Sequence, residues 1–284
     1  VQSFREEIGN PKSEKLLPLL EQLDSKLFSP ARPYLKVGDR LCIVPHGVLH
    51  SIPFQALFDG NQYVVQQYSI FYIPSSNILH FVKEKRTKKG FRLLAFGNPE
   101  LNNPSLALPF SEQEVKDIGK MLPGSSIYIG KDATKENLLN NINSYNITHI
   151  ASHAVYNRSD PMLSGIYLAA GSRPSIFTSE EIFNIRINSY LVTLSACETA
   201  VGRATRGDEV ISLSRAFLFA GTPSVISSLW SVNDESTAYL MSRFYLNLKT
   251  MDKATALQKA QIETMSTYPS SHYWGAFTLI GDWM

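Results

Sequence analysis

A cysteine and a histidine each follow a short apolar run, and together they could act as a nucleophile and its base. Cys197 comes three residues after the run 190–194, and His153 ends the run 147–153. An adjacent imidazole activates a thiol as a nucleophile and carries its proton, which is the chemistry of covalent acyl transfer. Taken alone, a free cysteine of this kind is more often a small core residue. A single histidine beside an apolar run is likewise more often a core residue with its hydrogen bonds satisfied.

The two apolar runs are typical of strands that are buried on both faces, as in a parallel sheet. The carboxyl ends of parallel strands meet at one edge of the sheet, which is where open α/β sheets place their ligands. His153 and Cys197 lie 44 residues apart. That separation leaves room for one crossover connection, so the two side chains can meet at that edge.

Strand-like and helix-like segments alternate along the chain, which predicts a mostly parallel α/β sheet with helices on both faces. Strands are expected at 41–45, 91–96, 127–129, 147–154, 190–194, 224–229 and 273–280. Helices are expected at 3–29, 111–122, 134–141, 208–220, 234–248 and 253–265. Ser111 followed by Glu114 has the pattern of a capping box, so we expect Ser111 to begin its helix.

Composition excludes several classes of function. The chain is 44% hydrophobic and 18% charged, which is typical of a globular protein, and its net charge of +2 gives no reason to expect a nucleic-acid or membrane partner. No apolar run approaches the roughly 20 residues of a membrane span. Two cysteines, Cys42 and Cys197, make no disulfide framework and suit a reducing compartment. We therefore expect a cytoplasmic protein, and a start at Val1 indicates a fragment of a longer chain.

Two other patterns are weak evidence for a metal site or a nucleic-acid site. His46 and His50 lie four apart, but Pro45 and Gly47 interrupt any helix there, and no third ligand clusters with them. We therefore expect no metal site and no cofactor. The basic run 83–89 has no interleaved aromatic residues, which is typical of a solvated loop rather than of a nucleic-acid site.

Short motifs follow one another in a definite order along nearly the whole chain. They occupy 39–50, 97–99, 149–154, 194–199, 207–209, 216–221, 228–230 and 273–277. In residue type and spacing they resemble the CHAT domain, a caspase-like peptidase domain that usually follows tetratricopeptide repeats.

The resemblance implies a caspase-hemoglobinase-like three-layer α/β sandwich with a mostly parallel central sheet. It implies a helical linker at 1–35 that follows an N-terminal repeat region, a degenerate pseudo-caspase half at 36–145 and a catalytic half at 146–284. By position, His153 is then the general base, and Cys197 is the nucleophile that forms a thioester acyl-enzyme. The backbone N–H groups of Ala154 and Cys197 would form the oxyanion hole.

The resemblance also places a substrate pocket at Trp230, Ser231 and Asp234. Separases have an acidic residue directly after this tryptophan, where it serves a P1 arginine, whereas this chain has Ser231 there. Asp234 is the nearest acid, and if it faces the cleft it predicts a basic P1 residue. The ordinary alternative is that Asn233 or Asp234 caps the helix that begins here.

The function implied is that of a cysteine endopeptidase acting on a protein substrate. We expect it to be latent until a partner or a TPR-type N-terminal region activates it, because the small, polar segment 199–207 has the composition of a movable loop. Two alternatives stay open. One is a catalytically silent caspase-like interaction module, and the other is a cysteine acyltransferase or amidase.

Overall fold

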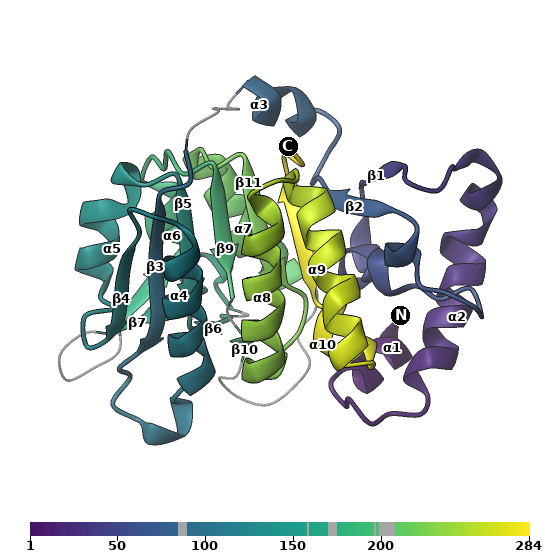
Figure 1. Cartoon of the computed structure of the whole chain (residues 1–284), viewed down its shortest axis with the longest axis horizontal. Helices are drawn as coiled ribbons and strands as arrows, with labels where there is room; N and C mark the ends of the chain where they lie inside the picture. Colours follow the sequence, from purple (N-terminus) through teal and green to yellow (C-terminus); the bar gives the residue numbers. More distant parts are fainter. Residues whose placement is uncertain (85–89, 158, 170–174, 196, 199–207) are drawn as a thin grey trace.

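The apolar runs of the sequence become the strands of one large, mostly buried sheet (Figure 1). The computed structural model describes residues 1–84, 90–157, 159–169, 175–195, 197–198 and 208–284. In spatial order the large sheet contains β1 (Arg40–Ile43), β2 (Ser69–Tyr72), β12 (Phe277–Gly281), β11 (Ser224–Ser228), β9 (Leu191–Leu194), β5 (Ile147–Ala151), β3 (Leu93–Pro99) and β4 (Ser126–Gly130). Among these described strands, only the β11–β12 pair is antiparallel. The predicted mostly parallel sheet is therefore confirmed.

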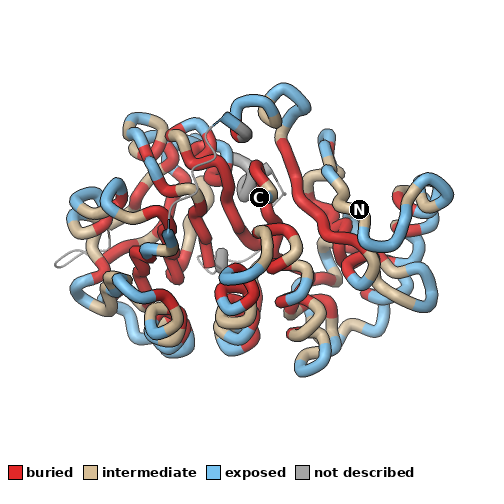
Figure 2. Tube along the Cα trace, turned by 45° about the horizontal axis from the view of Figure 1, so that its top comes forward, coloured by how far each residue is buried: buried red, intermediate tan, exposed pale blue. Residues whose placement is uncertain are grey.

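Helices cover both faces of this sheet, as expected for a three-layer α/β sandwich (Figure 1). The helices are α1 (Gln2–Ile8), α2 (Leu16–Leu27), α3 (Ile78–Glu84), α4 (Pro109–Met121), α5 (Lys135–Asn141), α6 (Ser179–Phe183), α7 (Asp208–Ala220), α8 (Asp234–Leu248), α9 (Lys253–Thr267) and α10 (Ser271–Trp274). Helices α4, α8 and α9 pack side by side on one face, and α6 and α7 lie on the other. Figure 2 shows the result, with buried strands in the centre and exposed loops outside. None of the described helices is long and apolar enough to cross a membrane.

A second sheet of four short strands continues from the large one. It contains β10 (Cys197–Glu198), β6 (His153–Val155), β7 (Gly165–Leu168) and β8 (Ser175–Thr178), in that order. Strand β6 follows β5 after a single residue, and β10 follows β9 after two. The small sheet therefore lies at the carboxyl ends of the central parallel strands, where the sequence predicted the functional groups.

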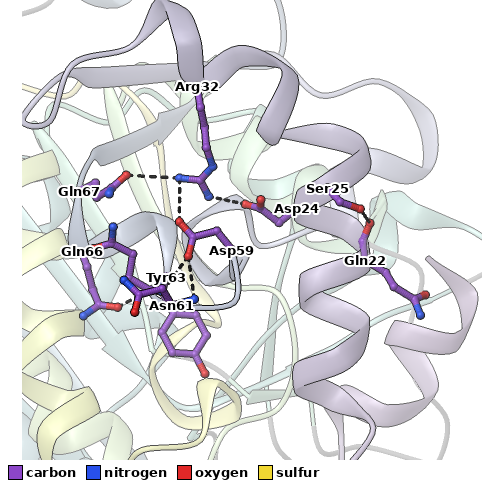
Figure 3. A network of polar contacts seen from close by, with 10 residues as sticks. Gln22, Asp24, Ser25, Arg32, Asp59, Asn61, Tyr63, Gln66 and Gln67 are labelled. Atoms are coloured by element: carbon purple, nitrogen blue, oxygen red, sulfur yellow. Dashed lines mark hydrogen bonds and ion pairs between the residues drawn. The ribbon is translucent and has the colours of Figure 1, made fainter.

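The N-terminal segment is part of the folded body. The expected helix at 3–29 is two helices, α1 and α2, whose Phe4 and Leu20 are buried in the main core. Figure 3 shows the polar contacts between the end of this segment and the loop before β2. The Arg32 guanidinium lies 2.7 Å from the Asp24 carboxylate and 3.4 Å from that of Asp59, which belongs to the loop before β2. Burial raises the pKa of Asp24 even with Arg32 beside it.

Two expected element boundaries differ from the structure. Helix α4 begins at Pro109 rather than Ser111, because proline suits the first helical position, where its missing N–H would have no partner. The capping box is therefore wrong: the Ser111 hydroxyl donates to the Leu108 carbonyl at 2.9 Å, inside the first turn. The last expected strand, 273–280, is helix α10 followed by the shorter β12. The expected line between halves at residue 145 falls between β4 and β5 of the same sheet, and the division into halves stays a prediction.

Helix α4 approaches β3 closely because Gly97 has no side chain. A Cβ atom at Gly97 would lie 2.6 Å from Cγ2 of Val115 and 2.8 Å from the backbone oxygen of Ser111. Both atoms belong to α4, and a backbone oxygen moves only with its helix. Any larger residue at position 97 therefore has to push α4 away from the sheet.

We expect Gly97→Ala to lower the free energy of unfolding by about 2 kcal/mol, the usual cost of overpacking a well-packed contact. Urea unfolding of the purified protein measures this value. Gly9→Ala is the matched control, since Gly9 has ordinary helical φ and ψ angles and no atom within 4 Å of the added carbon. Equal stability of the Gly97→Ala variant and wild type would show that α4 can move at no cost.

Candidate active site

The backbone pairing of two central strands brings the predicted cysteine and histidine together. In the large sheet β5 pairs in parallel with β9, and Ile150 lies opposite Leu194. The small sheet continues this register, so that His153 of β6 lies opposite Cys197 of β10. Neighbouring strands are about 4.8 Å apart. The two residues are therefore direct neighbours across a parallel ladder, which the sequence could only suggest.

A backbone carbonyl holds the ring of His153. The side chain is buried, with 4% of the residue exposed, and its Nε2 lies 2.9 Å from the carbonyl oxygen of Leu106. Because a carbonyl only accepts hydrogen bonds, Nε2 must carry the proton, and in the neutral ring the lone pair is then on Nδ1. A base whose ring is oriented by a third group is the arrangement that nucleophilic catalysis requires. The sequence offered no signal for Leu106, because every residue has a carbonyl group.

Leu106 also lines a cleft. It has a volume of about 480 Å³ and is formed mainly by the loop that follows β3, with Gly130 of β4 at its end. Among the described residues that line it, Glu100 is the only charged one. Leu106 thus both lines the cleft and contacts His153, and Glu100 is an acidic residue at the cleft wall.

Beneath the paired strands lies a buried network of polar groups. Glu114 of α4 and His149 of β5 are fully buried, and their Oε1 and Nε2 atoms approach to 2.7 Å as an ion pair, outside the alignment of a hydrogen bond. The Ser195 hydroxyl donates to Oε2 of Glu114 at 3.3 Å. The hydroxyl of Tyr245 in α8 contacts His149 Nδ1 at 3.1 Å and Thr193 Oγ1 at 2.9 Å. This network joins β5, β9, α4 and α8 just below the strand ends.

The side chains of Asn233 and Asp234 accept hydrogen bonds from different helices. Asn233 caps α8, since its side chain accepts a hydrogen bond from the N–H of Ser236 at 3.0 Å. Asp234 instead accepts from the N–H of Phe110 at 2.9 Å, at the beginning of α4. Burial raises the pKa of Asp234 to about 6; the nearby charge of Glu114 adds to the rise, and the N–H groups of α4 oppose it.

The remaining predicted residues have the following surroundings. The indole of Trp230 donates to the carbonyl of His272 at 2.9 Å, and its ring meets the edge of Phe4 in α1 at 6.3 Å between centroids. Ser231 is half-buried. Ala154 is half-buried and lies between Glu198 and Ile166 of the neighbouring strands. Their roles in substrate binding and in the oxyanion hole stay predictions.

Two further expectations concern the surroundings of the site. The loop predicted to be movable, 199–207, lies outside the described residues. In the part of the chain that the structure describes, no group of three His, Cys, Asp or Glu residues could hold a metal ion.

We expect Asp234 to make stability depend on pH. A carboxyl group whose pKa is raised on folding from 3.8 to about 6 takes up a proton when the protein folds, so stability falls as the pH rises through that window. Asp234→Asn keeps an acceptor for the Phe110 N–H but removes the titration. Between pH 4 and 7, wild type should lose about 2 kcal/mol of unfolding free energy relative to this variant, as measured by urea unfolding. A difference that does not change with pH would contradict the raised pKa.

Comparison with known proteins shows relatives in sequence and in fold. A mouse protein, Tetratricopeptide repeat protein 28, is 27% identical over 297 residues, which cover 86% of this chain but only 12% of the relative's length. The separase chain of the Saccharomyces cerevisiae separase–securin complex has a similar fold, with a TM-score of 0.57 and 15% identity over 82% of this chain and 15% of that one. The Arg-specific cysteine proteinase gingipain R also has a TM-score of 0.57, with 11% identity over 98% of this chain and 69% of its own.

The family model described as the CHAT domain matches residues 17–282, nearly the whole chain. The motifs that suggested this family are spread over both halves of the sheet, and the two solved structures share its caspase-like α/β architecture. The chain therefore belongs to the CHAT domain family.

Proposed function

We propose that this chain is a cysteine endopeptidase domain in which Cys197 is the nucleophile and His153 the general base. One observation carries this assignment: Cys197 lies directly opposite a buried histidine whose Nε2 is bonded to a carbonyl. This leaves Nδ1 as the basic nitrogen. The cysteine proteinase gingipain R has a similar fold and supports the same reaction class.

The proposed reaction has two stages. In the first, Nδ1 of His153 takes the thiol proton, and the Cys197 thiolate attacks the carbonyl carbon of the peptide bond. The backbone N–H groups of Ala154 and Cys197 stabilise the oxyanion. The imidazolium then gives its proton to the leaving amine, which leaves a thioester on Cys197. In the second, His153 takes a proton from water, and the resulting hydroxide attacks the thioester and releases the acid and the thiol.

Contacts of the N-terminal helix support regulation from that side. Phe4 of α1 packs on Trp230, which follows the strand next to β9. The carbonyl of Ile8 lies 2.6 Å from Nδ1 of His272, whose own carbonyl binds the Trp230 indole. A displacement of α1 would thus reach Trp230, one of the residues predicted from the sequence to bind substrate. The TPR relative makes an N-terminal repeat region a natural source of such a displacement, and a latent isolated domain follows from it.

The dyad predicts selective covalent labelling. A peptidyl chloromethyl ketone should alkylate Cys197, and His153→Gln should slow this labelling by at least about 1000-fold, because the two residues act as one unit. Peptide mapping by mass spectrometry measures both rates. The isolated domain should be labelled more slowly than a chain that includes its N-terminal repeats.

Cys42 is the matched control, since it is an exposed thiol on the edge strand β1. It should react with iodoacetamide but show no preference for the peptide reagent. If Cys197 is labelled no faster than Cys42, the chain is the silent interaction module instead. If it is labelled but transfers the acyl group to an amine, product masses will show the acyltransferase.

The cleft beside Leu106 is the substrate pocket in this proposal. Glu100, which is exposed, would favour a basic P1 side chain through a charge-assisted hydrogen bond. Asp234 is a weaker candidate, since its carboxylate already accepts a hydrogen bond at the start of α4. Gingipain R, which is described as Arg-specific, supports a basic preference.

A peptide library scanned at P1 tests this selection. Glu100→Gln should lower kcat/KM for an arginine substrate by about tenfold, the value of one charged hydrogen bond, and leave a neutral substrate unchanged. Asp234→Asn should keep the wild-type profile. The reverse pattern would assign P1 selection to Asp234, and no change in either variant would indicate a neutral P1 preference.

A further inference from the structure

The loop between β3 and α4 carries the carbonyl that binds His153, yet few apolar contacts hold it. Its residues 102–105 are all exposed, and only Pro99 and Leu101 are buried. The short 3-10 helix η5 (Pro104–Leu106) presents the Leu106 carbonyl. Because a mostly exposed loop has no core to fix its position, polar anchors must decide where Leu106 lies.

Asn98, at the start of this loop, forms hydrogen bonds with residues at its end. Its side-chain oxygen accepts a hydrogen bond from the N–H of Leu108 at 2.8 Å, and its own N–H donates to the Ser111 hydroxyl at 3.0 Å. The same hydroxyl donates to the carbonyl of Leu108 at 2.9 Å. Asn98 and Ser111 thus hold Leu108 by both of its backbone groups.

The backbone at Asn98 is suited to this task. It has a φ of +45°, in the left-handed region that asparagine and glycine tolerate best. The register of β3 with β4 shifts between Gly97 and Pro99, on either side of it. The chain therefore leaves the sheet at Asn98, where a turned backbone directs the amide side chain back over the loop.

We infer that Asn98 is a positioning residue for the general base. Leu106, whose carbonyl lies 2.9 Å from Nε2 of His153, is two residues from the anchored Leu108. When the anchor is lost, the carbonyl moves away from Nε2 of His153, and the preference for the Nε2–H tautomer weakens. This role rests on the proposed function for its kinetic consequence, but its effect on the histidine ring does not.

The test measures the tautomer of His153 by two-bond ¹H–¹⁵N NMR at pH 8.5, above the usual histidine pKa. Spectra of Cys197→Ala protein exclude pairing with a thiolate, and His153→Gln assigns the signals. We expect the Nε2–H form in the parent protein. Asn98→Gly removes the side-chain acceptor but tolerates the positive φ, and should raise the Nδ1–H form several-fold.

Ser111→Ala breaks the same anchor independently, within a helix where alanine is favourable, and should give the same shift. Asn143→Ala is the matched control: its amide bridges Arg186 and Asn188 at the opposite end of β5. In protein with Cys197 present, Asn98→Gly should lower kcat about tenfold, the loss of one hydrogen bond. KM should change as well, because Asn98 lines the cleft proposed as the substrate pocket.

An unchanged His153 tautomer in Asn98→Gly and Ser111→Ala would overturn the inference. An equally large tautomer shift in Asn143→Ala would also overturn it, because it would indicate a general loss of rigidity in the protein. Because the NMR measurement needs no substrate, it stands even if the chain proves to have no peptidase activity. Shifted tautomers without peptidase activity would keep the positioning role and reject only the proposed function.

Discussion

The parallel pairing of β5 with β9 is the constraint on which the candidate site depends. Residues 44 apart lie opposite one another in the large sheet, as Ile150 and Leu194 do, and the same offset places His153 opposite Cys197 in the small sheet. A slip of one residue would bring Ser152 or Ala154 to the cysteine instead. Both strands are buried on both faces, so their apolar side chains alone tolerate such a slip. The register therefore has to be specified by something other than hydrophobic burial.

Buried polar groups supply that specification. His149 and Thr193 are opposite one another in the two strands, and the hydroxyl of Tyr245 contacts both. In any other register these groups would lose their shared partner, and each buried polar group without a partner costs about 1–3 kcal/mol. The ion pair between Glu114 and His149 acts in the same way. Both groups are fully buried, so separating them in a wrong arrangement is costly.

Helix α4 connects this register to the site. Its buried Glu114 meets β5 and the end of β9, its first N–H groups receive Asp234, and its Ser111 holds the loop that presents Leu106. All of these contacts require α4 to lie close against β3, which Gly97 permits. The orientation of the His153 ring is thus a consequence of helix packing, and a change that moves α4 should alter the pocket and the base together.

The sequence by itself determined the α/β class, the buried strands and the two residues at their ends, because apolar runs and small residues leave a local pattern. It also determined the family, through motifs spread over both halves of the sheet. Only the tertiary structure decided which carbonyl holds His153, where Asp234 binds and that Glu114 is buried rather than capping a helix. Leu106 and His153 are 47 residues apart, and Asp234 and Phe110 are 124 apart. Contacts between residues so far apart in the chain leave no local sequence pattern. A backbone carbonyl, moreover, is the same for every residue type. Neither the Leu106–His153 contact nor the Phe110–Asp234 contact could therefore be predicted from the sequence.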